Sequence, residues 1–134
     1  MKIGVIGAGA AGLIAGAFAA KGGARVDIID RNEKTGKKLF LTGKGRCNIT
    51  NSADIDAFLK NVPHNGRFLY SAFDGFFNDD IIKLINSCGV RTKLERGGRY
   101  FPESDKSSDV IRALQTNAVR CGANIVLNSR VSSV

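Results

Sequence analysis

The sequence has few of the residues that build metal centres. It contains one histidine, His64, and three cysteines, Cys47, Cys88 and Cys121, which form no C-x-x-C pair. A structural zinc site needs about four such ligands at close spacing, so no metal site is predicted. An odd and sparse set of cysteines is typical of a reducing compartment, and we expect a cytoplasmic protein.

An uninterrupted hydrophobic run is also missing. Residues 3–20 are apolar and rich in alanine, but five glycines interrupt them and only Lys2 supplies positive charge in front. The run continues directly into a second strand-like segment, and its length is marginal for a membrane span. We therefore predict neither a signal peptide nor a membrane partner. The chain shows no internal repeat and no low-complexity linker.

The composition is that of one globular domain of 134 residues, with 43% hydrophobic and 24% charged residues. Sixteen glycines exceed the usual share of about 7%, so tight turns and close backbone contacts are expected. The net charge of +8 favours an anionic partner, such as a phosphorylated cofactor or nucleic acid.

The first thirty residues have the pattern of a strand, a helix and a second strand. Lys2–Ile6 is a short apolar strand, Ala11–Lys21 is an alanine-rich helix, and Arg25–Ile29 is the second strand. This spacing is typical of a right-handed βαβ crossover. We predict an α/β fold, a Rossmann-like doubly wound parallel sheet that is incomplete in this chain.

The remaining pattern is mostly helical. Residues 31–51 are expected to form a glycine- and lysine-rich loop. Further helices are predicted at 53–61, 67–73, 78–88 and 105–120, and strands at 91–95, 99–101 and 123–127. A last strand-like alternation covers 130–134.

Residues 7–12 read G-A-G-A-A-G between the first strand and the first helix. In this context the G-x-G-x-x-G pattern indicates a dinucleotide-binding turn, whose glycines allow the tight turn and the close approach of a pyrophosphate. The free N–H groups at the helix start attract phosphate oxygens. The predicted contacts are Gly7, Gly9, Ala10, Ala11 and Gly12.

Asp30 ends the second strand, about twenty residues after this turn. An acid there accepts hydrogen bonds from ribose hydroxyls, and Asp30 and Arg31 are both predicted to contact the cofactor. Arg31 could pair with a 2′-phosphate, but the acid before it argues against NADP. Asp27 is the alternative, but its place inside the strand is less suitable. The motif does not separate FAD from NAD.

Residues 36–51 carry four cations, three glycines and no acid. They offer backbone N–H groups and positive charge to an anion, although they lack the order of a P-loop. Phe40 is their only aromatic residue, which disfavours a stacking platform for single-stranded nucleic acid. A solvated charged loop is the alternative interpretation.

The stretch GKKLFLTGKGRCNITN, with GAGAAG before it and GRYFPES after it, resembles a bacterial family of FAD-dependent oxidoreductases that includes aminoacetone oxidase-like proteins. They belong to the two-dinucleotide-binding-domain class of flavoproteins, with a glutathione-reductase-like fold. The resemblance covers essentially the whole chain. It implies that the glycine turn and Asp30 bind the adenosine and pyrophosphate end of FAD. It places further residues along the pyrophosphate and towards the flavin: Lys38, Gly45, Arg46, Cys47 and Asn48.

Several residues allow two interpretations. Cys47 is either a reactive thiol beside the flavin or a small residue that fills space, and a lone cysteine more often does the latter. His64 is expected to be structural or exposed. Arg99 and Tyr100 either face substrate or pack in a hairpin. No catalytic acid–base pair is identified.

The sequence thus predicts an FAD-dependent oxidoreductase, with NAD(P)H or a small-molecule substrate as a further partner and no nucleic acid. The alternatives are an NAD-dependent Rossmann dehydrogenase and a basic nucleic-acid-binding module. The flavin interpretation expects positive charge beside the glycine turn, and the nucleic-acid interpretation expects a stripe on an outer face.

Only three parallel strands are predicted, whereas a doubly wound sheet normally has five or six. We therefore expect these residues to be the N-terminal part of an FAD-binding domain, with the strand Lys2–Ile6 left at an unpaired edge that favours self-association. Such a piece is expected to hold FAD weakly or not at all.

Overall fold

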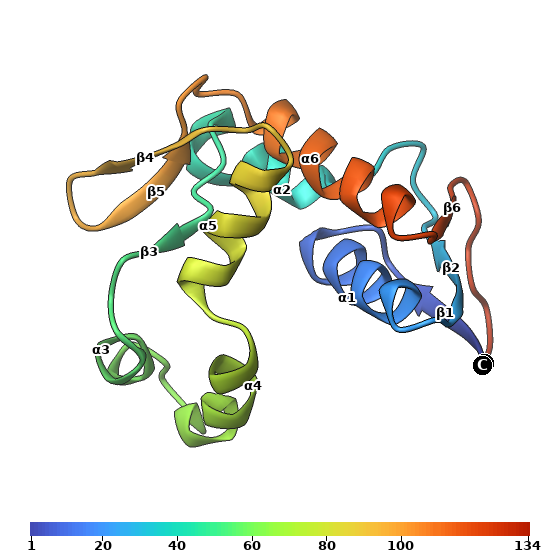
Figure 1. Ribbon diagram of the computed structural model, residues 1–134, viewed down its shortest axis with the longest axis horizontal. Helices are drawn as coiled ribbons and strands as arrows, with labels where there is room; N and C mark the ends of the chain where they lie inside the picture. Colours follow the sequence, from blue (N-terminus) through green and yellow to red (C-terminus); the bar gives the residue numbers. More distant parts are fainter.

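A computed structural model describes all residues, 1–134, and shows the predicted parallel sheet. Its strands are β1 (Lys2–Ile6), β2 (Arg25–Ile29) and β6 (Asn124–Val126), in the order β1-β2-β6. Both pairings are parallel, with Ile3 opposite Val26 and Ile28 opposite Ile125. The α/β fold and the edge position of β1 are confirmed (Figure 1).

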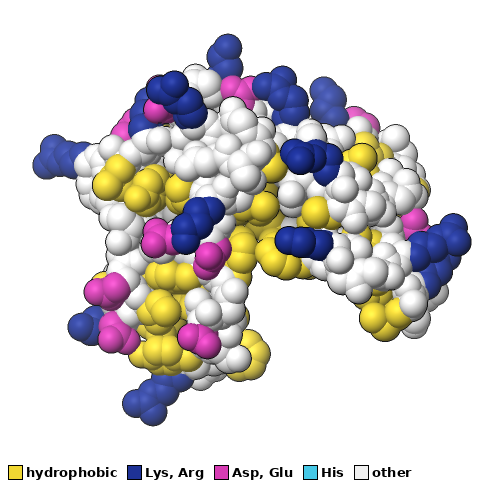
Figure 2. Space-filling view, in the orientation of Figure 1, with side chains coloured by type: hydrophobic (Ala, Val, Ile, Leu, Met, Phe, Trp, Pro, Cys, Tyr) yellow, Lys and Arg dark blue, Asp and Glu magenta, His cyan; other side chains and the backbone are white.

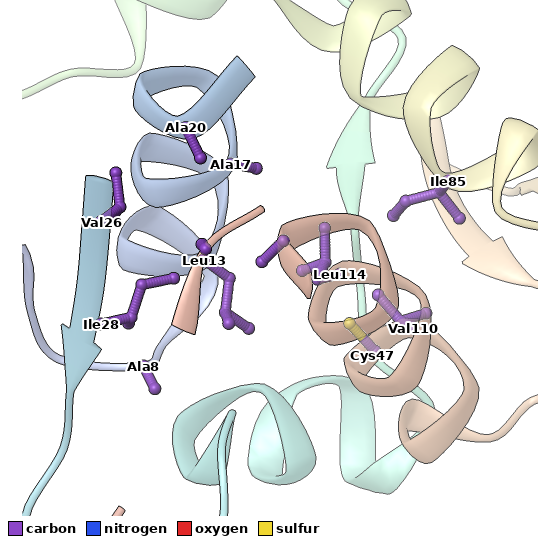
Figure 3. Close-up of a cluster of buried hydrophobic side chains, with 12 residues drawn as sticks. Ala8, Leu13, Ala17, Ala20, Val26, Ile28, Cys47, Ile85, Val110 and Leu114 are labelled. Atoms are coloured by element: carbon purple, nitrogen blue, oxygen red, sulfur yellow. The ribbon is translucent and has the colours of Figure 1, made fainter. Parts of the chain in front are cut away.

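Two long helices cover one face of this sheet. They are α1 (Ala10–Lys21) and α6 (Ser107–Arg120), which pack against each other as well as on the strands (Figure 1). Alternate residues of β2, Val26 and Ile28, point into this layer and are fully buried, as expected for one face of a strand. Leu13 of α1 and Leu114 of α6 meet them in the main core (Figure 3).

A second, antiparallel sheet lies on the other side of the molecule. It contains β3 (Thr50–Asn51), β5 (Arg99–Pro102) and β4 (Thr92–Glu95), with β5 in the middle. The hairpin predicted around Gly97 and Gly98 is confirmed, and both glycines have a positive φ. Strand β3 was not predicted, because two residues are too short to show an alternating pattern.

The remaining elements lie between β2 and β4 along the chain. The helices are α2 (Lys37–Leu41), α3 (Ile55–Lys60), α4 (Tyr70–Gly75) and α5 (Asn78–Ser87), with 3-10 turns at Thr42–Gly45 and Gly66–Leu69. Helices α3 and α4 form a small lobe away from the parallel sheet (Figure 1). Phe58, Phe73 and Phe77 pack edge-to-face or tilted against one another, with ring centroids 4.9–5.5 Å apart.

The structure corrects two predictions. Residues 31–51 are not one loop, since they contain α2, a 3-10 turn and β3. Helix α2 was not predicted because it is short and lies between glycines, which are typical of loops. Residues 130–134 form no strand, since they pair with neither edge strand of the parallel sheet, β1 or β6. No helix of this chain has the length and apolar character needed to cross a bilayer.

Candidate functional site

The glycine turn lies at the carboxyl end of β1 and leads into α1. Gly7 has φ +104°, a conformation that residues with a side chain rarely adopt. Its N–H donates to the carbonyl of Ile29 at 2.7 Å, which holds the turn against the end of β2. Gly9 is the cap residue, and the helix begins at Ala10.

The other two glycines of the motif have different surroundings. A Cβ on Gly12 would collide with the backbone carbonyl of Gly7, so α1 can pack this closely on the turn only without a side chain there. A Cβ on Gly9 would meet no atom within 4 Å. The space beside Gly9 is therefore open, and it fits the close approach of a pyrophosphate.

The start of α1 is also suited to an anion electrostatically. No side chain caps its first N–H groups, and its first turn contains no acidic residue. Uncapped N–H groups and the helix dipole attract negative charge in such a place. Ala10 and Ala11, both predicted contacts, lie in this first turn.

Asp30 follows β2 and faces the same turn. Its Oδ2 accepts a hydrogen bond from the backbone N–H of Ala8 at 2.7 Å, and its Oδ1 accepts from the N–H and the side chain of Asn32, both at 2.8 Å. Partial burial alone would raise the pKa of Asp30, but these hydrogen bonds and the nearby Arg31 charge outweigh it and lower the pKa. A carboxylate accepts about four hydrogen bonds, so Asp30 retains capacity for a ribose hydroxyl.

Asp27, the alternative acid, lies away from the turn. Its carboxylate accepts a hydrogen bond from Asn124 at 2.9 Å and lies 4.0 Å from the ammonium of Lys2. Both partners lie on neighbouring strands rather than on the turn. Of the two acids, only Asp30 is placed beside the glycines.

A pocket of about 380 Å³ opens at the carboxyl ends of the parallel strands. Gly7, Asp30 and Arg31, all predicted site residues, line it. It also includes Asn32, Ser129 and Arg130, which sequence reasoning missed. Ser129 and Arg130 follow β6, and ligands of open α/β sheets bind beyond the carboxyl ends of the strands, so their position after the third strand was a usable signal.

Residues 36–51, which we call the basic segment, begin beside the glycine turn. The N–H of Gly36, directly before α2, donates to the carbonyl of Ala8 at 2.9 Å. Residues 31–52 hold six lysines and arginines and one acid. Lysine and arginine side chains are spread over the face of the molecule shown in Figure 2, with acidic side chains among them. Lys38 is exposed on α2.

The other predicted cofactor contacts in the basic segment lie in different surroundings. Arg46 donates to both carboxylate oxygens of Glu95, at 3.0 and 3.1 Å. Cys47 is fully buried in the main core (Figure 3), and burial raises the pKa of its thiol. Its side chain fills space, as the more common role of a lone cysteine predicts. Gly45 is half-buried and Asn48 is exposed.

The sequence allowed Arg99 and Tyr100 either to face substrate or to pack in a hairpin, and both lie in the second sheet. Tyr100 is half-buried on β5 opposite Thr50, while Arg99 is exposed and donates to the carbonyl of Arg96. His64 is exposed in the lobe. None of the three lines the pocket beside Asp30.

The sequence profile described as "HI0933-like protein Rossmann domain" matches residues 1–134, the whole chain. The chain belongs to this family. Members of the HI0933-like family are expected to share the parallel sheet and the glycine turn described above, which are the parts that define a Rossmann domain.

Two curated relatives are similar along nearly the whole chain. It is 35% identical to a 3-dehydro-bile acid delta(4,6)-reductase of Clostridium scindens over 136 residues, which covers 99% of this chain and 32% of that protein. It is also 35% identical to a ribosomal RNA dihydrouridine synthase of Escherichia coli over 131 residues, covering 97% of this chain and 32% of that protein. The HI0933-like chain thus spans about a third of the length of these relatives.

Solved structures confirm the fold. The open conformation of a flavocytochrome c3 fumarate reductase matches with a TM-score of 0.62 and 23% identity, over 99% of this chain and 27% of that one. At this identity the likeness concerns the fold alone. It agrees with the Rossmann-domain assignment of the family.

Proposed function

We propose that the chain binds FAD and forms the N-terminal part of the FAD-binding domain of a flavin-dependent oxidoreductase. The observation that carries this proposal is the open space beside Gly9, bounded by the uncapped start of α1 and the carboxylate of Asp30. In it, the first turn of α1 would bind the pyrophosphate and Asp30 would bind the ribose. When bound, FAD would supply the hydride chemistry.

The adenosine end of the cofactor is assigned to the pocket beyond the strands. Asp30, Asn32 and Ser129 supply polar groups there, and Arg31 and Arg130 supply positive charge. The acid at the end of β2 favours a free ribose hydroxyl over a 2′-phosphate. An NAD-dependent dehydrogenase would use the same turn, so the resemblance of residues 36–51 to the family of FAD-dependent oxidoreductases is what favours FAD.

The rest of the enzyme is proposed to come from sequence that the relatives have and this chain does not. The relatives are about three times longer, and the sheet here has three parallel strands. Further strands and a substrate domain would enclose the flavin ring. We propose that this chain alone contributes the nucleotide half of the site, with weak binding and no turnover.

The reaction class is proposed from the two relatives together. One name describes a reductase acting on double bonds of a 3-dehydro bile acid, and the other describes formation of dihydrouridine. Each adds two hydrogens across a carbon–carbon double bond near a carbonyl group. The chain is 35% identical to both, which favours this shared reaction over either substrate. The narrower resemblance to aminoacetone oxidase-like proteins stays a prediction.

The cofactor proposal is tested by titrating FAD, NAD⁺ and NADP⁺ into the purified chain and following the quenching of flavin fluorescence or the heat of binding. FAD is expected to bind saturably and more tightly than either nicotinamide nucleotide. Asp27→Asn is a matched control for Asp30→Asn, because Asp27 lies on β2, the strand that Asp30 follows, with its carboxylate away from the turn. Preference for NAD⁺ would refute the flavin assignment.

A further inference from the structure

The segment Gly43–Cys47 has an unusual backbone. Four of its five residues have left-handed φ values: Gly43 at +57°, Lys44 at +57°, Gly45 at +88° and Cys47 at +65°. Lys44 and Cys47 carry side chains, for which this conformation is unfavourable. A strained segment of this kind persists only where its surroundings hold it, and such segments cluster at ligand sites.

The side chain of Arg46 ties this segment to the antiparallel sheet. Its Nη1 donates to both oxygens of Glu95 and lies 3.4 Å from Oδ1 of Asp105. Its guanidinium also lies over the ring of Phe101, 4.1 Å from the centroid. Phe101 is fully buried, so it is a fixed platform for the arginine.

The two carboxylates are held in turn by Lys93. Its ammonium lies 2.7 Å from Asp105 and 3.5 Å from Glu95. Glu95 and Lys93 are on β4, and Asp105 follows β5, so the acids are fixed by the hairpin. Two cations and two carboxylates thus form one network, which leaves the charge of Arg46 compensated inside the protein.

We propose that Glu95 and Asp105 are positioning residues for the cofactor site, which act through Arg46 to hold Gly43–Cys47 in the conformation that receives the cofactor. This inference rests on the proposed function for the identity of the cofactor. The guanidinium of Arg46 is an anchor of the segment and not a phosphate ligand. The neighbouring backbone and Lys44 remain available to the cofactor.

The alternative role of Arg46 makes opposite predictions. If its guanidinium bound the pyrophosphate directly, Glu95 would compete for it, and Glu95→Gln would leave FAD affinity unchanged or tighten it. If Arg46 is an anchor, Glu95→Gln and Arg46→Gln weaken FAD binding to a similar extent. In the Arg46→Gln background, adding Glu95→Gln should weaken binding little further, because Glu95 acts through Arg46.

The first test uses Cys47 as a reporter and needs no flavin. Cys47 is buried directly beside the anchor, whereas Cys88 and Cys121 are partly exposed and serve as internal references. We expect Glu95→Gln and Arg46→Gln to speed thiol labelling of Cys47 on the order of tenfold, read by mass spectrometry, through local opening of the segment. Glu103→Gln is the matched control, since Glu103 pairs only with the exposed Arg91.

The double variant Arg46→Gln with Glu95→Gln is expected to label Cys47 little faster than Arg46→Gln alone. Glu95→Asp and Arg46→Lys provide milder variants should a neutral substitution unfold the chain, and they are expected to speed labelling less. Unchanged labelling in Glu95→Gln would overturn the proposal. Equal acceleration in Glu103→Gln, or a double variant in which the two accelerations multiply, would also overturn it.

FAD titration of the same variants completes the test. Parallel weakening in Arg46→Gln and Glu95→Gln, with little further loss in the double variant, supports a positioning role, because independent effects of the two substitutions would add. Weakening in Arg46→Gln alone overturns it. If the wild-type chain binds no FAD while Cys47 responds as expected, the network's hold on the segment is supported and the proposed cofactor is refuted.

Discussion

The carboxylate of Asp30 accepts a hydrogen bond from the backbone N–H of Ala8 at 2.7 Å. The acid that is proposed to bind the ribose therefore also fixes the glycine turn that is proposed to bind the pyrophosphate. One side chain joins the ends of β1 and β2, so the two halves of the nucleotide site are shaped together.

Replacing Asp30 is expected to affect both roles. Asp30→Ala should weaken FAD binding by about 1–3 kcal/mol, the usual effect of losing a charge-assisted hydrogen bond. It should also lower the free energy of unfolding, since the amide of Ala8 loses its acceptor. Calorimetric titration and urea unfolding measure the two effects. Unchanged FAD affinity would refute the ribose assignment.

Two glycine substitutions in the same turn should have different consequences. Gly9→Val is expected to leave the fold intact and abolish FAD binding, because its side chain would occupy the open space beside the turn. Gly12→Val is expected to destabilise the fold itself, because its Cβ would collide with the carbonyl of Gly7. Circular dichroism melting separates the two. A Gly9→Val variant with normal FAD affinity would exclude this turn as the site.

The pKa of Asp30 predicts a specific response to acid. Because the pKa is lowered in the folded state, the ionised carboxylate contributes stability above its unfolded pKa of about 4, and that contribution is lost as pH falls through the folded value. The difference in unfolding free energy between wild type and Asp30→Asn should therefore shrink between about pH 5 and about pH 2. Asp105 and Glu33, whose pKa values are also lowered, are common to both proteins. A constant difference over this range would contradict the assignment.

Cys47 is expected to act through packing. Cys47→Ala removes a buried sulfur from the core, so the free energy of unfolding should fall by about 1–2 kcal/mol, as for other small truncations of core residues. FAD affinity should change little. A full-length relative that carries the same change should keep its rate of flavin reduction, and loss of that rate with an intact fold would reveal a reactive thiol instead.

Local patterns predicted the parallel sheet and the position of the glycine turn well. The turn at residues 7–12, Asp30 and the strands around them follow from short motifs with a direct physical reason for each residue. The role of Arg46 could not be predicted in this way. Its partners Glu95 and Asp105 are 49 and 59 residues away in the sequence, and only the folded hairpin brings them to it.

The sequence also failed to predict two short elements and one residue that long-range contacts bring into the pocket. Helix α2 has five residues among glycines and lysines, and β3 has two, so neither shows a periodic pattern. Arg130 joins the pocket only because β6 pairs with β2 and places the following residues beside Asp30. Each of these features depends on tertiary contacts that local sequence does not encode.

The most direct test of the central claim is to follow the backbone amide signals of the 134-residue chain by NMR while titrating ADP and then FAD. ADP is the part of FAD that this chain is proposed to bind, so both ligands should shift the signals of Gly7, Gly9, Ala10, Ala11 and Asp30, with similar and weak affinity. The same titration of Gly9→Val should show no such shifts. Shifts confined to other parts of the chain, or no saturable shifts with either ligand, would contradict the account.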